Sequence, residues 1–209
     1  MDIVRFNYFN VERILTNNYK FYEPDCLNVY LRYKQINNSV TDLLFETPWI
    51  DYYSDKSFKE SSDLKKIYIS LLFKNGTHNL KILQFYNIIN KIDNYVKFNN
   101  SFLNHFNDST TKVFSEIDNT FIPSLKYYPN QPVIENSALR LKIFPKHIKV
   151  FNEKNKKIEL SDIDYDCEIK EKLQCHSIWL SPDTYGITWI GKTLKVKPKP
   201  DPYKDILFS

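Results

Sequence analysis

Short apolar or alternating stretches recur along the chain and predict β-strands. In "LNVYLRYKQ" the apolar set is Val29 and Leu31 with Tyr33 beside them, and polar residues lie between. Such alternation is typical of a strand with one face on a core. The predicted strands lie at residues 27–35, 40–50, 64–74, 113–118, 138–144 and 147–151, and a hairpin follows at 177–197.

One stretch has helical periodicity instead. Its apolar residues recur at steps of three and four, which places them on a single helix face. They are Ile82, Phe85, Ile89, Ile92 and Val96. The spacing predicts an α-helix over about 80–97, with Thr77 or Asn79 as its N-cap.

Many short strands, one helix and no alternation of strand and helix indicate a mainly β fold. We expect a barrel or sandwich with the helix inserted. The stretch 51–63 is predicted to be a polar loop, and 152–173 a charged loop or helix. One domain is predicted over 1–197, followed by a flexible, proline-stiffened tail at 198–209.

Composition narrows the class of protein. Only three glycines occur in 209 residues, which excludes a Gly-rich phosphate-binding loop, and aromatic residues reach 16%. The three cysteines are odd in number and widely spaced, which favours a reducing compartment. No secretory signal or membrane-length apolar run is found. We therefore expect an intracellular soluble protein.

The net charge is only +4, so any affinity for a polyanion depends on where the cations lie. Opposite their apolar sets, four strands carry cations mixed with aromatic rings. These residues are Tyr30, Arg32, Lys34, Arg140, Lys142, Phe144, Lys149, Phe151, Trp179, Trp189, Lys195 and Lys197. Rings stack on unpaired bases and cations contact phosphates, so such faces favour binding of single-stranded nucleic acid.

A second interpretation of these faces stays open: a half-buried sheet has a polar outer face, and lysine blocks edge pairing. The two tryptophans favour the binding interpretation, because exposed tryptophans usually have a partner. The assignment of Trp189 depends on Gly191. A bulge there would reverse the alternation and separate Trp189 from Lys195 and Lys197.

Catalytic motifs are not found. The four histidines stand in unrelated contexts, and Cys175 and His176, being adjacent, point to opposite faces of a strand. The acidic run "DIDYD" (162–166) lacks the glycine and the distal glutamate of a calcium loop. Walker loops, nucleophile elbows and HExxH are missing too. The expectation is a non-catalytic protein without metal or cofactor.

The order of several short motifs resembles one family. "LNVYLRYK…LLFETPWI" ends in a Thr47-Pro48 step, and the helix carrying "NIINKIDNYV" follows. "IPSLKYYP…LRLKIFPKHIKVF" and "IWLSPDTYGITWIGKTLKV" complete the series, which spans roughly 27–197. Together they resemble the single-stranded DNA-binding proteins of large eukaryotic DNA viruses, distantly related to the bacteriophage T7 type.

That resemblance implies an OB-like β-barrel with an inserted α-helix, which coats single-stranded DNA during viral replication, recombination or repair. It also places Lys126 near the DNA-binding groove of such a barrel, together with Arg140, Lys142, Trp179 and Trp189. The implied location is the host cytoplasm or nucleus. Replication proteins contacted through the tail, and a second copy of the chain in a homodimer, are the other partners considered. The alternative function is a structural virion or capsid-associated β-barrel protein.

Overall fold

A large β-sheet and a single α-helix make up most of the part of the chain that the computed structural model describes. The described residues are 3–23, 26–54, 58, 64–74, 76–99, 120–127, 134–163, 167–181 and 183–199. The predicted strand at 113–118 lies outside them, as do residues 200–209 of the predicted tail. Pro198 ends the last strand, and Lys199 forms an ion pair with Asp51 at 3.1 Å.

Thirteen strands form the sheet. They are β1 (Ile14–Glu23), β2 (Cys26–Lys34), β3 (Val40–Asp42), β4 (Leu44–Glu46), β5 (Asp51–Ser54), β6 (Ile67–Leu72), β7 (Thr120–Ile122), β8 (Leu125–Tyr127), β9 (Ser137–Ile143), β10 (Lys149–Asn152), β11 (Lys157–Ile158), β12 (Cys167–Leu180) and β13 (Thr184–Pro198). The helix is α1 (Leu80–Phe98), and short 3₁₀ helices lie at Phe6–Tyr8, Val11–Arg13, Ile134–Asn136 and Leu160–Asp162.

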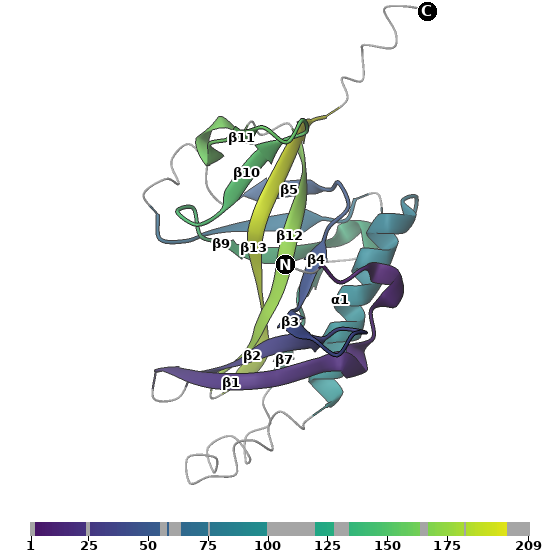
Figure 1. Cartoon of the computed structure of the whole chain (residues 1–209), viewed down its shortest axis with the longest axis vertical. Coiled ribbons are helices and arrows are strands. Elements are labelled where there is room, and N and C mark those ends of the chain that lie inside the picture. Colours follow the sequence, from purple (N-terminus) through teal and green to yellow (C-terminus); the bar gives the residue numbers. More distant parts are fainter. Residues whose placement is uncertain are drawn as a thin grey trace, which may run out of the picture.

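The main strand order is β1-β2-β12-β13-β9-β6-β5. Figure 1 shows β12 and β13 running together along the molecule, with β1 and β2 crossing near one end and β9, β10 and β5 near the other. β3 pairs with β2, and β4 with β12, while β7 and β10 pair with β13. The mainly β class is confirmed. The OB-like barrel is not, because the sheet does not close within the described residues.

The helix prediction is confirmed almost to the residue. All five residues of the predicted stripe are buried, and the Asn79 side chain accepts hydrogen bonds from the backbone N–H groups of Lys81 and Ile82. Phe85 stacks on Phe6 and on Phe73, with ring centroids 5.7 and 5.9 Å apart. The helix therefore closes one side of the core, beside the sheet (Figure 1).

Two loop predictions are wrong in part; residues 55–57 and 59–63 of the first lie outside the described residues, and the second contains the 3₁₀ helix Leu160–Asp162. Residues 51–54 form β5, which pairs with β6 although its sequence is polar. The charged stretch 152–173 contains β11 and the first half of β12. In that half every second residue, from Cys167 to Leu173, is buried, while the residues between them are partly exposed. Their charges mark the outer face of a long strand and not a loop.

Two irregularities interrupt the β12–β13 ladder. Leu173 pairs with Gly191 but Lys172 pairs with Thr193, so Lys192 is an extra residue. Further along, Cys175 pairs with Trp189 and Ser177 with Thr188, which leaves His176 unpaired in the ladder. Each extra residue reverses the alternation of faces. As a result Trp189 faces the same side as Leu194 and Val196, which is the core.

Gly191 stands at this bulge for a steric reason. A Cβ at that position would overlap the Glu171 Oε1 and come 3.2 Å from Ile143 Cγ1. The side chain of Glu171 therefore occupies the space that the glycine leaves in the core. The backbone of Glu171 is fixed by Thr47, which donates its N–H to the Glu171 carbonyl at 2.9 Å. In return the Thr47 Oγ1 accepts the Glu171 N–H at 2.8 Å.

Candidate nucleic-acid interface

A groove of about 660 Å³ opens over the sheet, with buried core residues such as Leu27 and Trp189 at its base. Its lining comes from β1, β2, β6, β9, β12 and β13 and from the segment 122–126. Four lining residues are cationic and none of the described lining residues is a carboxylate. The cations are Lys66, Lys126, Arg140 and Lys142, and the aromatic side chains include Tyr22, Tyr68, Phe144 and Trp179.

Strand register explains why these side chains meet. Trp179 on β12 lies opposite Asn28 on β2 and opposite Gly186 on β13. Paired residues on neighbouring strands point to the same face of a sheet. By the same rule Lys142 on β9 shares its face with Tyr68 on β6. One face of the sheet thus continues from β1 to β6 as the groove.

Two cationic side chains lie near the ring of Tyr68 at one end of the groove. The Arg140 guanidinium lies 4.2 Å from its ring centroid, and the Lys66 Nζ lies 5.9 Å from it. Sequence reasoning missed both Tyr68 and Lys66 by treating 64–74 as a fully buried strand. The signal was present, because Lys66, Tyr68 and Ser70 alternate with apolar residues.

Trp179 is the half-buried indole of the groove. Its ring lies against Gly186, where an added Cβ would come 2.9 Å from the indole Cζ2 and 3.0 Å from the Ile122 carbonyl oxygen. A glycine is needed at 186 for this close approach. The alternation predicted around Trp179 is confirmed, because its neighbours Ile178 and Leu180 are buried while Trp179 itself is partly exposed.

Trp189 corrects the sequence prediction. Its side chain is only 2% exposed, so it contributes to the groove from beneath and offers no ring face to a base. The cause is the bulge at Lys192, which turns it away from Lys195 and Lys197. Uninterrupted alternation through Gly191 predicts Trp189 beside those lysines, and the bulge breaks that alternation.

Trp189 instead anchors one wall of the groove. Its Nε1 donates to the Ser124 Oγ at 2.8 Å. Ser124 in turn donates its backbone N–H and its hydroxyl to the Asp93 carboxylate, at 2.8 and 2.6 Å. Burial raises the pKa of Asp93 to about 6, and the hydrogen bonds from Ser124 oppose that rise. The chain of contacts fixes the segment that carries Lys126.

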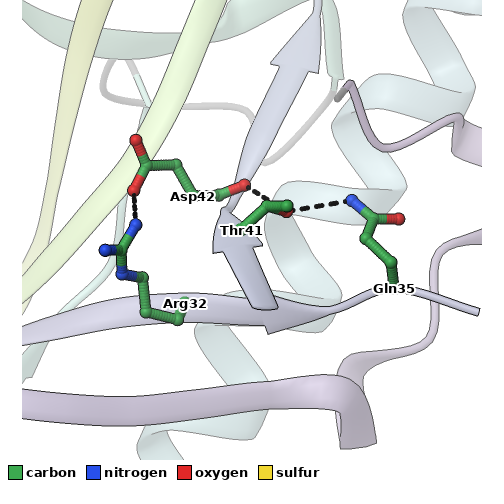
Figure 2. Close-up of polar contacts among 4 residues, drawn as sticks. All are labelled: Arg32, Gln35, Thr41 and Asp42. Carbon is green, nitrogen blue, oxygen red and sulfur yellow. Dashed lines mark hydrogen bonds and ion pairs between the residues drawn. The ribbon is translucent and has the colours of Figure 1, made fainter. Parts of the chain in front are cut away.

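The predicted residues of β2 lie beside the groove. Tyr30 is on the groove face, where it meets His176 edge-on, while Lys34 is exposed at the end of the strand. Arg32 forms an ion pair with Asp42 of β3, as Figure 2 shows. On the same strand Thr41 accepts a hydrogen bond from Gln35 at 3.0 Å. The carboxylate neutralises Arg32, which weakens its attraction for a phosphate.

The other predicted residues lie elsewhere on the sheet. Phe151 on β10 pairs with Lys195 on β13, and Lys149 pairs with Thr193. Lys197 forms an ion pair with Glu168 at 2.6 Å and lies 5.0 Å above the Trp49 ring. None of Lys149, Phe151, Lys195 and Lys197 lines the groove. The structure therefore divides the predicted site into two surfaces.

A second cavity of about 870 Å³ shows what distinguishes the groove. It lies between the N-terminal segment, the start of α1 and the residues around Trp49. Its Lys170 and Lys197 are paired with Glu46 and Glu168 at 2.7 and 2.6 Å. Arg5 and Lys81 also line this cavity, so its four cations share the lining with two carboxylates, whereas the described lining of the groove has four cations and no carboxylate. A polyanion therefore suits the groove better.

No protein-family model matches this chain, and a search of curated proteins returns no significant match. Among the described residues, no three histidine, cysteine or acidic side chains gather as metal ligands do. The described helices include none that combines the length and the apolar character needed to cross a membrane.

Proposed function

We propose that this protein is a non-catalytic single-stranded DNA-binding protein that coats the strand during viral DNA replication, recombination or repair. The observation that carries the proposal is the groove. It combines four cations and several aromatic rings with no carboxylate among its described lining residues. The ordered motifs of the sequence point to the same function.

The chemistry of the groove matches an unpaired strand. Base stacking on an aromatic side chain contributes roughly 1–3 kcal/mol per base, and Lys or Arg side chains follow the backbone phosphates. Trp179 supplies a ring held close against Gly186, with Lys126, Arg140 and Lys142 in the same groove. Bases paired in a duplex have their faces covered by neighbours, so the groove favours single strands.

The OB-like barrel stays part of this proposal. Ile50 and Ile169 form an isolated bridge in which each backbone N–H donates to the other carbonyl, at 2.9 and 3.0 Å. Ile50 directly precedes β5, which ends the strand order, and Ile169 lies in β12. The bridge supports a sheet that curls back towards itself around the core, as an OB-like barrel does.

Fluorescence anisotropy with labelled oligo(dT) and a duplex of the same length tests this function. We expect the single strand to bind at least about tenfold tighter, because only unpaired bases can stack on Trp179. If all four groove cations contact phosphates, the log–log salt slope should be roughly −3. Equal affinity for the two forms, or affinity that does not change with salt, would refute the proposal.

A further inference from the structure

His176 enters the groove through an irregularity of the sheet. It is the extra residue between Cys175 and Ser177, where the register of β12 against β13 shifts. Bulges next to binding sites re-aim side chains. His176 lines the groove, and its ring meets the Tyr30 ring edge-on, with centroids 5.2 Å apart and planes at 77°.

One ring nitrogen of His176 is left without a partner. Its Nδ1 is buried and makes no hydrogen bond within the described chain. A buried polar atom without a partner destabilises the fold, so its presence calls for a group that compensates it. Because the buried Nδ1 has no open surface, a base edge supplies the missing partner only when the imidazole turns towards the groove, which His176 lines.

The surroundings of His176 favour the neutral form of its imidazole. Burial, and next Lys192 of β13, lower its pKa, and Lys142 of β9 acts in the same direction. Asp42 of β3 opposes them, and Tyr30 of β2 contacts the ring. A neutral imidazole has one donor and one acceptor, which suits a base edge better than a phosphate.

Other polar side chains lie next to His176 on the groove floor. The Ser177 Oγ donates to the Asn28 Oδ1 at 3.2 Å, and both residues line the groove. Ser177 lies two residues from Trp179, a separation of about 7 Å along a strand. When one base stacks on Trp179, the next base of the strand can therefore lie beside this polar cluster on β12.

We propose that His176 contacts the edge of the unpaired base next to the one on Trp179, and so gives the protein a preference among bases. The inference rests on the proposed function, because it needs a single strand in the groove. Phosphate contacts carry no sequence information, whereas hydrogen bonds to base edges do. The cations of the groove then bind any single strand, whereas His176 and its polar neighbours distinguish one base from another.

Labelled dT, dC and dA homo-oligomers of equal length test this idea by anisotropy. We expect the wild-type affinities to differ by about fivefold or more, the effect of roughly one hydrogen bond. His176→Phe keeps a ring beside Tyr30 but removes the nitrogens, and it should reduce the spread to within about twofold. His176→Gln should retain part of it. His78→Phe, an exposed histidine outside the groove, is the matched control and should retain all of it.

The outcomes separate the two proposals. Wild-type affinities that agree across the three oligomers, or an unchanged spread in His176→Phe, would overturn the role of His176 and leave single-strand binding intact. If none of the oligomers binds, the proposed function is wrong and this inference falls with it. Circular dichroism of each variant shows that it is folded, and the wild-type comparison tests the inference even if the His176→Phe variant is not.

Discussion

Replacing Lys126 and Lys142 together by glutamate is expected to weaken binding of oligo(dT) about 100-fold near 0.1 M salt. Both lysines line the groove, and neither has an ion-pair partner among the described residues. A charge-assisted contact contributes about 1.5–3 kcal/mol, so the loss of two contacts at the lower end of this range corresponds to a factor of this order. The log–log salt slope should also become shallower by roughly 1.4, because two phosphates lose their cations.

The matched control is the double variant Lys149→Glu and Lys195→Glu. The alternation pattern predicts these two lysines as site residues too, but they lie outside the groove, on β10 and β13. The control has the same net charge, so it measures the general effect of charge on affinity. We expect it to lose no more than about threefold, because screened charges act weakly at a distance. If the control loses as much affinity as the groove variant, the single-stranded DNA follows the β10–β13 surface and not the groove.

Replacing Glu171 by methionine is expected to stabilise the protein strongly at pH 8 and to flatten its stability between pH 5 and 8. Glu171 is 0% exposed, and neither carboxylate oxygen has a partner within the described residues. Burial raises the pKa of Glu171 to about 8 from an ordinary value of 4.5. Methionine has a similar length and no charge, and Gly191 leaves room for it.

The direction follows from proton linkage. Between pH 4.5 and 8 the folded protein holds a proton on Glu171 that the unfolded chain has released, so stability falls as the pH rises. The fall is on the order of 4 kcal/mol over that window. Below pH 4.5 both states are protonated, and there the contribution of Glu171 is fully present.

Urea unfolding of wild type and Glu171→Met at pH 5, 6.5 and 8 measures the difference. Asp93, whose pKa is raised to about 6, adds a fall of the same sign in both proteins, so the comparison isolates Glu171. Parallel pH profiles would show that Glu171 is not a protonated core residue. A Glu171→Gln variant, which also cannot titrate, should show the flattened profile even if methionine packs badly.

Local patterns predicted what depends on local geometry. The stripe of α1 and its Asn79 cap follow from helical spacing within one segment, and they are correct. The faces of β2 and β9 follow from alternation and are also correct: Leu31 and Leu141 are buried, while Lys142 reaches the groove. Such segments carry their own signal, since neighbours along the chain decide which side is apolar.

Features that depend on pairing were missed. The extra residues His176 and Lys192 exist only relative to a partner strand, so the sequence of β13 alone put Trp189 on the wrong face. β12 alternates buried and charged residues, but a fully buried Glu171 hides the pattern. That burial depends on Gly191, which lies twenty positions away in the chain, and no spacing rule relates the two residues.

Intrinsic tryptophan fluorescence tests most directly whether the groove is the site for single-stranded DNA. The three tryptophans lie in different settings: Trp179 in the groove, Trp189 in the core and Trp49 beside the second cavity. Titration with oligo(dT) should quench wild type and Trp49→Phe alike, because a base stacks only on Trp179. The quenching should disappear in Trp179→Phe. Quenching that survives in Trp179→Phe but is lost in Trp49→Phe would contradict the groove as the binding site.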